Sequence, residues 1–337
     1  MGTEEPTVII SRAPFRISLG GGGTDLQSYY SLYGGFLIGA GIDKYVYISV
    51  NRRFYDSIRL SYSKTEIVNS VEEIQHDIFR ETFKFLGTKH GIEAVSVADM
   101  PANAGLGSSS SFTVALLNAL HAYKREYVSP AQLAEEACHI ELNLLQQPIG
   151  KQDQYMAAHG GLTCLTFDKD GAVEVEPLNL PEDVTADLQY RLVMLYCGKE
   201  RAASEILIEQ DTKTRDLDPQ VTGALTAIKE IGLETKRQLR AGKIDALGEL
   251  MDEHWKVKKS LSSAISDDFI DECYEKARKM GAAGGKIMGA GGGGFFLFYV
   301  NPAQKRQLID AMTLVGLKHV SFDFDFQGAK IIFNVQP

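Results

Sequence analysis

A glycine-rich turn followed by four consecutive serines is the stretch of this sequence best suited to holding an anion. Residues 101–111 read Pro-Ala-Asn-Ala-Gly-Leu-Gly-Ser-Ser-Ser-Ser, and the apolar run over 112–120 that follows predicts a helix. The start of a helix leaves four backbone N–H groups without partners and carries the positive end of the helix dipole. Serine hydroxyls can cap such a helix, bind phosphate oxygens or ligate magnesium. One cap needs only one hydroxyl, so four in a row favour a phosphate loop over an ordinary capped helix.

Two acidic residues further along the chain could complete a phosphate site. Glu141 lies on the otherwise apolar flank of a helix predicted over 130–147, where a half-buried carboxylate needs either a salt bridge or a metal ion. Asp153 follows twelve residues later in a glycine-flanked turn, where an aspartate is commonly a helix cap. On the sequence pattern alone, the structural and the functional interpretation of each residue stay open.

Two further glycine runs lie towards the ends of the chain. Residues 20–25 read Gly-Gly-Gly-Gly-Thr-Asp, which suits either close backbone approach to a ligand or a flexible hairpin. Residues 281–294 formally contain G-x-G-x-x-G, but a strand is predicted after them where a dinucleotide-binding fold requires a helix. A Walker A loop is also excluded, because Gly285-Lys286 is preceded by Met280 where that motif requires glycine.

These motifs, in this order, resemble those of the GHMP small-molecule kinases, the superfamily of galactokinase, homoserine kinase, mevalonate kinase and phosphomevalonate kinase. Residues 12–25 are similar to the first superfamily motif, 101–111 to the second and 281–294 to the third. The pattern Gly-x-x-Asp-Gln, twelve residues after a helical glutamate, is similar to the part that supplies the catalytic aspartate and the magnesium-binding glutamate. The resemblance implies an ATP-dependent phosphotransferase that uses Mg²⁺.

The resemblance also implies a role for each motif residue. Asp153 would accept or orient the proton of the substrate hydroxyl, and Arg16 would offset the charge beside it. Ser109 and Glu141 would bind the magnesium ion that bridges the β and γ phosphates. The nucleotide phosphates would be bound by the loop and helix start, at Gly105, Leu106, Gly107, Ser108, Ser109 and Ser110.

The first motif indicates the substrate. Gly-Gly-Gly-Gly-Thr-Asp, in place of Gly-Glu-His-Thr-Asp, is similar to the D-glycero-D-manno-heptose 7-phosphate kinases, with fucokinases as near relatives. By resemblance, the C1 hydroxyl would be phosphorylated to give the 1,7-bisphosphate, for nucleotide-activated heptose and surface polysaccharide. The substrate-binding residues would be Gly22, Gly23, Thr24, Asp25, Lys151, Arg201 and Gly292.

A 7-phosphate on the substrate would demand cations separate from the nucleotide site. The candidates in the sequence are Lys44, Arg52, Lys199 and Arg201. Two alternatives to a heptose 7-phosphate kinase stay open. One is an L-fucose or other unphosphorylated sugar 1-kinase, which needs no basic pocket. The other is a non-catalytic sugar sensor on the same fold.

The bulk composition is that of an ordinary globular protein. The 337 residues are 44% hydrophobic and 23% charged, and the net charge of −9 argues against a nucleic-acid surface. The sequence has neither a signal-like start nor a run of 18 uncharged apolar residues, so no membrane segment is predicted. Four widely separated cysteines indicate reduced, buried thiols. We expect a cytoplasmic protein whose partner is a small sugar phosphate, with a homodimer left open.

The elements that must position these residues predict an α+β fold in two domains. The polar composition near 180–190 divides an N-terminal domain, 1–185, from a C-terminal domain, 186–337. By resemblance these would be a ribosomal S5 domain 2-like domain with the phosphate loop and a ferredoxin-like domain. A closing strand over 319–326 is expected to turn Phe326 inward and Asp325 outward. Other strands are expected over 7–19, 35–42, 45–51 and 57–61, and helices over 74–86, 201–209, 221–240, 246–261 and 267–280.

Overall fold

The computed structural model describes residues 8–198 and 203–335, and its strands form two separate sheets. The strands are β1 (Val8–Gly20), β2 (Gly35–Arg52), β3 (Ile58–Ser61), β4 (Thr65–Val68), β5 (Ile92–Ala98), β6 (Leu162–Phe167), β7 (Val173–Pro177), β8 (Leu192–Tyr196), β9 (Ala282–Ile287), β10 (Phe295–Val300), β11 (Lys318–Val320) and β12 (Lys330–Val335). The first sheet has eight strands, in the order β12-β1-β2-β5-β3-β4, with β6 paired to β2 and β7 to β6. The second has four strands, in the order β11-β8-β10-β9.

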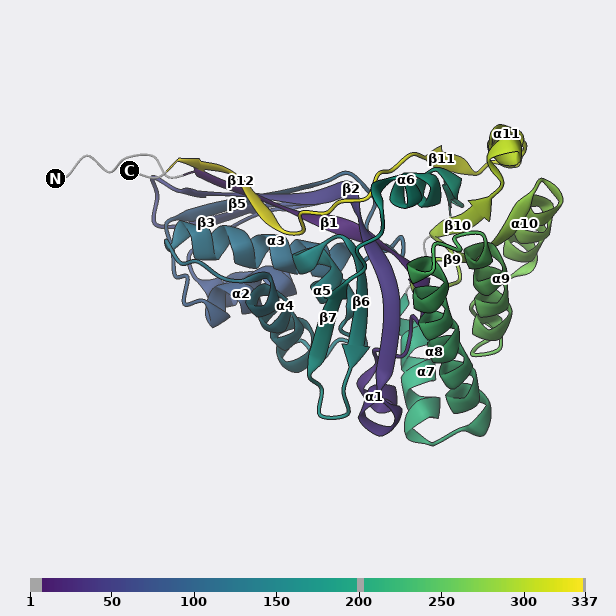
Figure 1. The fold of residues 1–337 in the computed structure, drawn as a ribbon. Helices are drawn as coiled ribbons and strands as arrows, with labels where there is room; N and C mark the ends of the chain where they lie inside the picture. Colours follow the sequence, from purple (N-terminus) through teal and green to yellow (C-terminus); the bar gives the residue numbers. More distant parts are fainter. Residues whose placement is uncertain (1–7, 199–202, 336–337) are drawn as a thin grey trace.

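Helices cover both sheets (Figure 1). They are α1 (Gln27–Tyr33), α2 (Asp77–Phe85), α3 (Ser108–Tyr123), α4 (Pro130–Cys138), α5 (Gln152–His159), α6 (Glu182–Arg191), α7 (Ala203–Arg215), α8 (Pro219–Arg240), α9 (Ala246–Lys259), α10 (Asp268–Lys279) and α11 (Lys305–Thr313). In Figure 1, α2 to α5 lie on one face of the first sheet, and α7 to α10 lie at the other end of the molecule. Helices and mostly antiparallel strands confirm the predicted α+β class.

Strand β1 carries the first group of predicted site residues into the centre of the fold. It pairs antiparallel with β2 on one side and with β12 on the other. Its second half is buried throughout, with Phe15 and Ile17 in the core. β12 pairs only with Val8–Arg12, whereas β2 pairs along the whole strand and the Arg16 amide donates to the Leu106 carbonyl at 3.1 Å, so Arg16 and Ser18 project from a well-supported backbone. The glycine turn that follows starts directly from this strand.

Helix α4 ends earlier than the sequence predicts, and the difference affects a site residue. The α-helix runs over Pro130–Cys138, with Ser129 as its N-cap, and continues as a π-helical turn, η2 (His139–Leu144). Such wide turns are rare and occur mainly at functional sites. Glu141 lies in this turn and is completely buried.

The closing strand predicted over 319–326 is wrong beyond Val320. Strand β11 stops there, Phe326 is 62% exposed and the carboxylate of Asp325 is buried. Asp325 accepts hydrogen bonds from the Tyr45 hydroxyl at 2.8 Å and from the Gly328 amide at 2.8 Å. The Asp325 carboxylate therefore points inward, against the predicted alternation, because its hydrogen-bond partners lie inside the fold. There it organises the turn into β12.

The last strand returns the chain to the first sheet. Strand β12 pairs antiparallel with β1, with Val335 opposite Val8. The domain boundary predicted after residue 185 falls inside helix α6 and stays a prediction. Within the described ranges, no helix has both the length and the apolar character needed to cross a bilayer.

His121 ties helix α3 to helix α4 and should make stability depend on pH. Its two ring nitrogens lie 2.8 Å from Glu126 Oε2 and 2.7 Å from Glu136 Oε2. Burial lowers the pKa of His121, but these hydrogen bonds outweigh it and leave the pKa raised. A raised pKa gives stabilisation that is complete below the unfolded-state pKa of about 6.5 and is lost as pH rises through the folded-state pKa.

We therefore expect His121→Gln to reduce the free energy of unfolding by about 1–2 kcal/mol near pH 6 and by clearly less near pH 9. Urea unfolding at the two pH values measures the difference. His90→Gln is the matched control, because His90 is 58% exposed and lies 3.7 Å from Asp56. Equal losses for His121→Gln at both pH values would contradict the assignment.

Candidate active site

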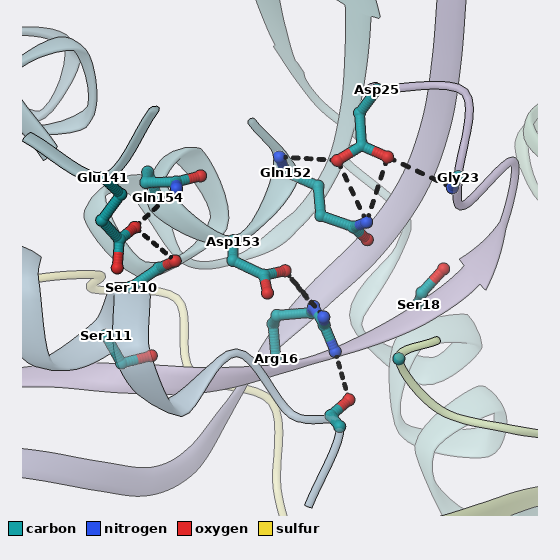
Figure 2. Close-up of polar contacts among 12 residues, drawn as sticks. Arg16, Ser18, Gly23, Asp25, Ser110, Ser111, Glu141, Gln152, Asp153 and Gln154 are labelled. Carbon is teal, nitrogen blue, oxygen red and sulfur yellow. Dashed lines mark hydrogen bonds and ion pairs between the residues drawn. The ribbon is translucent and has the colours of Figure 1, made fainter. Parts of the chain in front are cut away.

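A cavity of about 460 Å³ brings the predicted motifs together. It is bounded by the end of β1, the start of α3, the start of α5 and the loop after β9. Figure 2 shows the polar contacts on the sides contributed by β1, α3 and α5. The predicted residues that line this cavity are Arg16, Gly22, Gly23, Asp25, Gly105, Gly107, Ser108, Ser109, Ser110 and Asp153.

Asp153 lies beside the phosphate loop and is held by Arg16. The Nε and Nη2 atoms of Arg16 both lie 2.7 Å from Asp153 Oδ1, and Nη1 donates to the Gly105 carbonyl at 2.7 Å (Figure 2). A Cβ on Gly107 would lie 3.1 Å from the Asp153 carboxyl carbon, so the loop and the carboxylate are in contact. Within the described part of the chain, no hydrogen bond ends on Oδ2. That oxygen can accept a proton from a ligand.

The start of helix α3 is open to an anion. Its N-cap is Gly107, with φ of 82°, and no side chain in the described part of the chain caps the helix. A lone capped helix, the alternative to a phosphate loop, would use a serine hydroxyl for that purpose. The first amides of α3 are therefore directed at the cavity together with the positive end of the helix dipole.

The four serines have different partners. Ser109 Oγ donates to Glu141 Oε1 at 2.7 Å, and Ser110 Oγ donates to Glu141 Oε2 at 2.7 Å. Ser111 Oγ donates to the Pro14 carbonyl at 2.8 Å and so anchors α3 on β1. Ser108 lines the cavity. Two hydroxyls thus connect the phosphate loop to the buried carboxylate.

Among the described residues, the hydrogen-bond partners of Glu141 are all neutral. Besides the two serines, Thr113 Oγ1 donates to it at 3.0 Å and Gln154 Nε2 at 2.6 Å. No lysine, arginine or histidine among the described residues forms an ion pair with it. Burial raises the pKa of this carboxyl, against the four hydrogen bonds that lower it. The salt-bridge alternative considered for Glu141 therefore has no partner in the described ranges.

The oxygen atoms around Glu141 suit a magnesium ion. Mg²⁺ prefers oxygen ligands, and proteins commonly supply one or two carboxylates while substrate phosphates supply the rest. Ser109 Oγ and Glu141 Oε1 are 2.7 Å apart, at the edge of the phosphate loop. The neighbouring Gln154 Oε1 is buried and has no hydrogen-bond partner within the described residues. The donor set thus fits a hard divalent cation.

Asp25 forms the opposite wall of the cavity. It is buried and accepts hydrogen bonds from the Gln152 amide at 3.1 Å, from Gln152 Nε2 at 3.1 Å and from the Gly23 amide at 3.2 Å (Figure 2). Burial raises the pKa of Asp25, hydrogen bonds from Gln152 lower it and the charge of Asp153 raises it further. The Asp25 and Asp153 carboxylates are therefore neighbours, because Asp25 binds Gln152, the residue directly before Asp153 at the start of α5.

Several predicted residues do not line the cavity. Leu106 is buried, Thr24 Oγ1 donates to the Gly21 and Phe36 carbonyls, and Gly292 donates its amide to the Ile265 carbonyl. The ammonium of Lys151 donates to the Gly171 carbonyl at 2.6 Å and lies over the Tyr30 ring.

The basic residues predicted for a second phosphate fall into two groups. Lys44, which pairs with Asp43 at 2.8 Å, and Arg52, at the end of β2, do not line the cavity. Lys199 and Arg201 lie outside the described residues. The cavity has three other basic side chains that sequence reasoning missed, His254, Lys258 and Lys286.

An open helix start facing a carboxylate that is paired with a buried arginine defines the chain as a phosphotransferase of the small-molecule kinase class. Two family models match, described as "GHMP kinases N terminal domain" over residues 67–161 and "GHMP kinases C terminal" over residues 235–316. Together these matches take in just over half of the 337 residues. The chain belongs to the GHMP kinases, which use ATP as phosphate donor.

Similar proteins include sugar kinases. The D-glycero-alpha-D-manno-heptose 7-phosphate kinase of Campylobacter jejuni is 29% identical over 336 residues, which cover 96% of this chain and 98% of that protein. The galactokinase of Pyrococcus furiosus is 25% identical, over 90% of this chain and 92% of that protein. The crystal structure of a D-glycero-D-manno-heptose 1-phosphate kinase from Bacteroides thetaiotaomicron has the same fold, with a TM-score of 0.78 at 24% identity over 95% of this chain and 97% of that one.

The phosphate loop contacts the glycine loop of the third motif, residues 281–294, which we call the third glycine loop. This contact should be essential for ATP binding. Gly105 has φ of 79°, and a Cβ there would lie 2.7 Å from the Met288 carbonyl oxygen. We expect Gly105→Ala to raise the KM for ATP by at least about tenfold, because the loop must move. Gly91→Ala is the matched control, with φ of 68° and no atom within 4 Å of its Cβ. Equal effects of both variants on the KM for ATP would contradict the expectation.

Proposed function

We propose that this chain transfers the γ-phosphoryl group of ATP to the C1 hydroxyl of D-glycero-D-manno-heptose 7-phosphate, giving the 1,7-bisphosphate. The observation that carries the proposal is the Asp153 carboxylate, which lies against Gly107 at the start of α3 while Arg16 holds it. The near-full-length similarity to a heptose 7-phosphate kinase supports this choice of sugar. Asp25, with the two oxygens of its carboxylate, is suited to accept hydrogen bonds from vicinal sugar hydroxyls.

In the proposed reaction, Asp153 acts as the base. A carboxylate is much too weak a base to deprotonate a sugar hydroxyl beforehand, so the proton moves to Oδ2 while the new O–P bond forms. The bond from the γ-phosphorus to the bridging oxygen breaks at the same time, and ADP leaves. Arg16 holds Oδ1 and provides positive charge beside the transferred group.

The nucleotide phosphates would lie on the amides of residues 105–109 and on the first turn of α3. Ser109 and Glu141 would hold the magnesium ion. When bound, this ion supplies positive charge to the β and γ phosphate oxygens. The protein itself fixes the positions of the two Glu141 carboxylate oxygens, since Ser110, Thr113 and Gln154 donate hydrogen bonds to them.

A substrate panel tests the proposal. ADP release with ATP and magnesium is measured for heptose 7-phosphate, L-fucose and galactose, and the position of the new phosphate is identified by ³¹P NMR. The highest kcat/KM is expected for heptose 7-phosphate. A higher value for L-fucose would replace the proposal with a fucokinase, in line with the 26% identity over 64% of this chain to a bifunctional fucokinase of Arabidopsis thaliana.

A further inference from the structure

Two lysines in the cavity have no part in the reaction described so far. Lys286 lies on β9 and is only 2% exposed, and Lys258 lies on the last turn of α9. Both line the cavity with Arg16. Among the described residues, neither ammonium group lies within ion-pair distance of a carboxylate. A desolvated cation without a counter-ion is unfavourable, and burial with the charges of Lys258 and Arg16 keeps the pKa of Lys286 well below its usual value. An anionic ligand between these groups would stabilise their charged forms.

Lys286 is held in place by neutral groups. Its Nζ lies 3.1 Å from His254 Nδ1 and 3.5 Å from Ser18 Oγ. Burial, with the nearby lysines, keeps the pKa of His254 well below its usual value, so the ring is neutral and Nδ1 accepts a hydrogen bond. An ammonium has three donors, and these two neighbours occupy at most two of them. The third donor is available to a ligand in the cavity.

Lys258 is held by the third glycine loop. Its Nζ donates to the Ile287 carbonyl at 3.1 Å and to the Gly289 carbonyl at 2.5 Å. Although Lys258 as a whole is partly exposed, burial of its ammonium and the charge of Arg16 lower the pKa of Lys258 to about 7. An anion bound beside it would restore its full charge. Arg16, Lys258 and Lys286 are thus close enough to destabilise one another's charges.

The position of Ser18 indicates which phosphate the lysine cluster, Lys258 and Lys286, would bind. A Cβ on Gly22 would lie 3.3 Å from Ser18 Oγ and 4.0 Å from Gln152 Oε1, and Gln152 binds Asp25. Lys286 therefore borders the Asp25 wall, where the acceptor sugar would lie. The nucleotide phosphates have their own partners, the amides at the start of α3.

We propose that Lys286 and Lys258 bind the phosphomonoester of the acceptor sugar, with His254 positioning Lys286. This inference rests on the proposed function, because it assigns the 7-phosphate of that acceptor to a subsite. It replaces Lys44 and Arg52, which lie away from the cavity, as the source of the cations.

The subsite is tested with Lys286→Met and Lys258→Met, which keep the length of the stem and remove the charge. Lys256→Met is the matched control, because Lys256 lies on the same helix, is 70% exposed and pairs with Asp252. We expect kcat/KM for heptose 7-phosphate to fall about 100-fold in the two variants, since a charge-assisted hydrogen bond to phosphate is strong. Values for unphosphorylated D-glycero-D-manno-heptose, and the KM for ATP, should change less than about threefold.

Equal losses on both sugars would overturn the inference, and so would a large rise in the KM for ATP, which would assign the lysines to the γ-phosphate.

Calorimetric titration of heptose 7-phosphate without nucleotide separates this inference from the proposed function. If the wild type binds this sugar phosphate but does not phosphorylate it, the proposed function fails. Weaker binding by the lysine variants would still support the subsite, and unchanged binding would refute it. Should Lys286→Met fail to fold, Lys258→Met in the last turn of α9 gives the same comparison.

Discussion

Replacing Asp153 by asparagine is expected to lower kcat by about three orders of magnitude while the KM for ATP changes by less than about threefold. The amide has the shape of the carboxylate, and its oxygen can still accept hydrogen bonds from Arg16. It cannot take the proton of the acceptor hydroxyl, so the loss falls on the chemical step. Steady-state ADP release, with calorimetric binding of a non-hydrolysable ATP analogue, measures both quantities.

Asp170→Asn is the matched control for this variant, because it makes the same change in an exposed turn. Its kcat should equal that of the wild type. Near-wild-type turnover of Asp153→Asn would refute the role of Asp153 as base. A large loss of nucleotide affinity in this variant would instead indicate that Asp153 acts through the phosphate loop that it touches at Gly107.

The motif residues could be predicted because their contacts are determined by short stretches of sequence. The glycines and serines of residues 105–111 define both the loop and the helix start, whatever the rest of the fold does. The spacing of Glu141 and Asp153 was informative for a similar reason, since only residues 145–151 separate the helical segment from α5. The structure brings Asp153 to Arg16 and Glu141 to Ser109, as the motif pattern requires.

The lysine cluster could not be predicted from local pattern. Lys258 lies among three lysines in the last turn of α9, where cations are expected to be solvated and to interact with the helix dipole. Only the packing of α9 against β9 brings it to Lys286. A signal for Lys286 did exist, because a lysine within the buried strand Ala282–Ile287 must have an unusual environment. Asp325 shows the same limit, since its partner Tyr45 is 280 residues away.

Replacing Glu141 by glutamine is expected to lower kcat about 100-fold and to raise the magnesium concentration needed for half-maximal activity at least about tenfold. The side chain is buried, and its hydrogen-bonding partners are neutral, so the amide should fold in the same place. What the variant lacks is the negative charge that attracts a divalent cation to Ser109. Glu182→Gln, an exposed change at the start of α6, is the control.

The readout that separates a metal ligand from a structural carboxylate is the response to magnesium rather than the loss of activity. Thermal unfolding with ATP, measured with and without magnesium, should show a magnesium-dependent rise in Tm for the wild type and for Glu182→Gln but not for Glu141→Gln. A purely structural glutamate predicts the opposite pattern, in which Tm falls without ligands and the magnesium titration of activity keeps its midpoint. That pattern would move the metal site away from Glu141. The Asp153–Arg16 pair and the open start of α3 would still provide for phosphoryl transfer, because the Arg16 contacts to Asp153 and Gly105 do not involve this carboxylate.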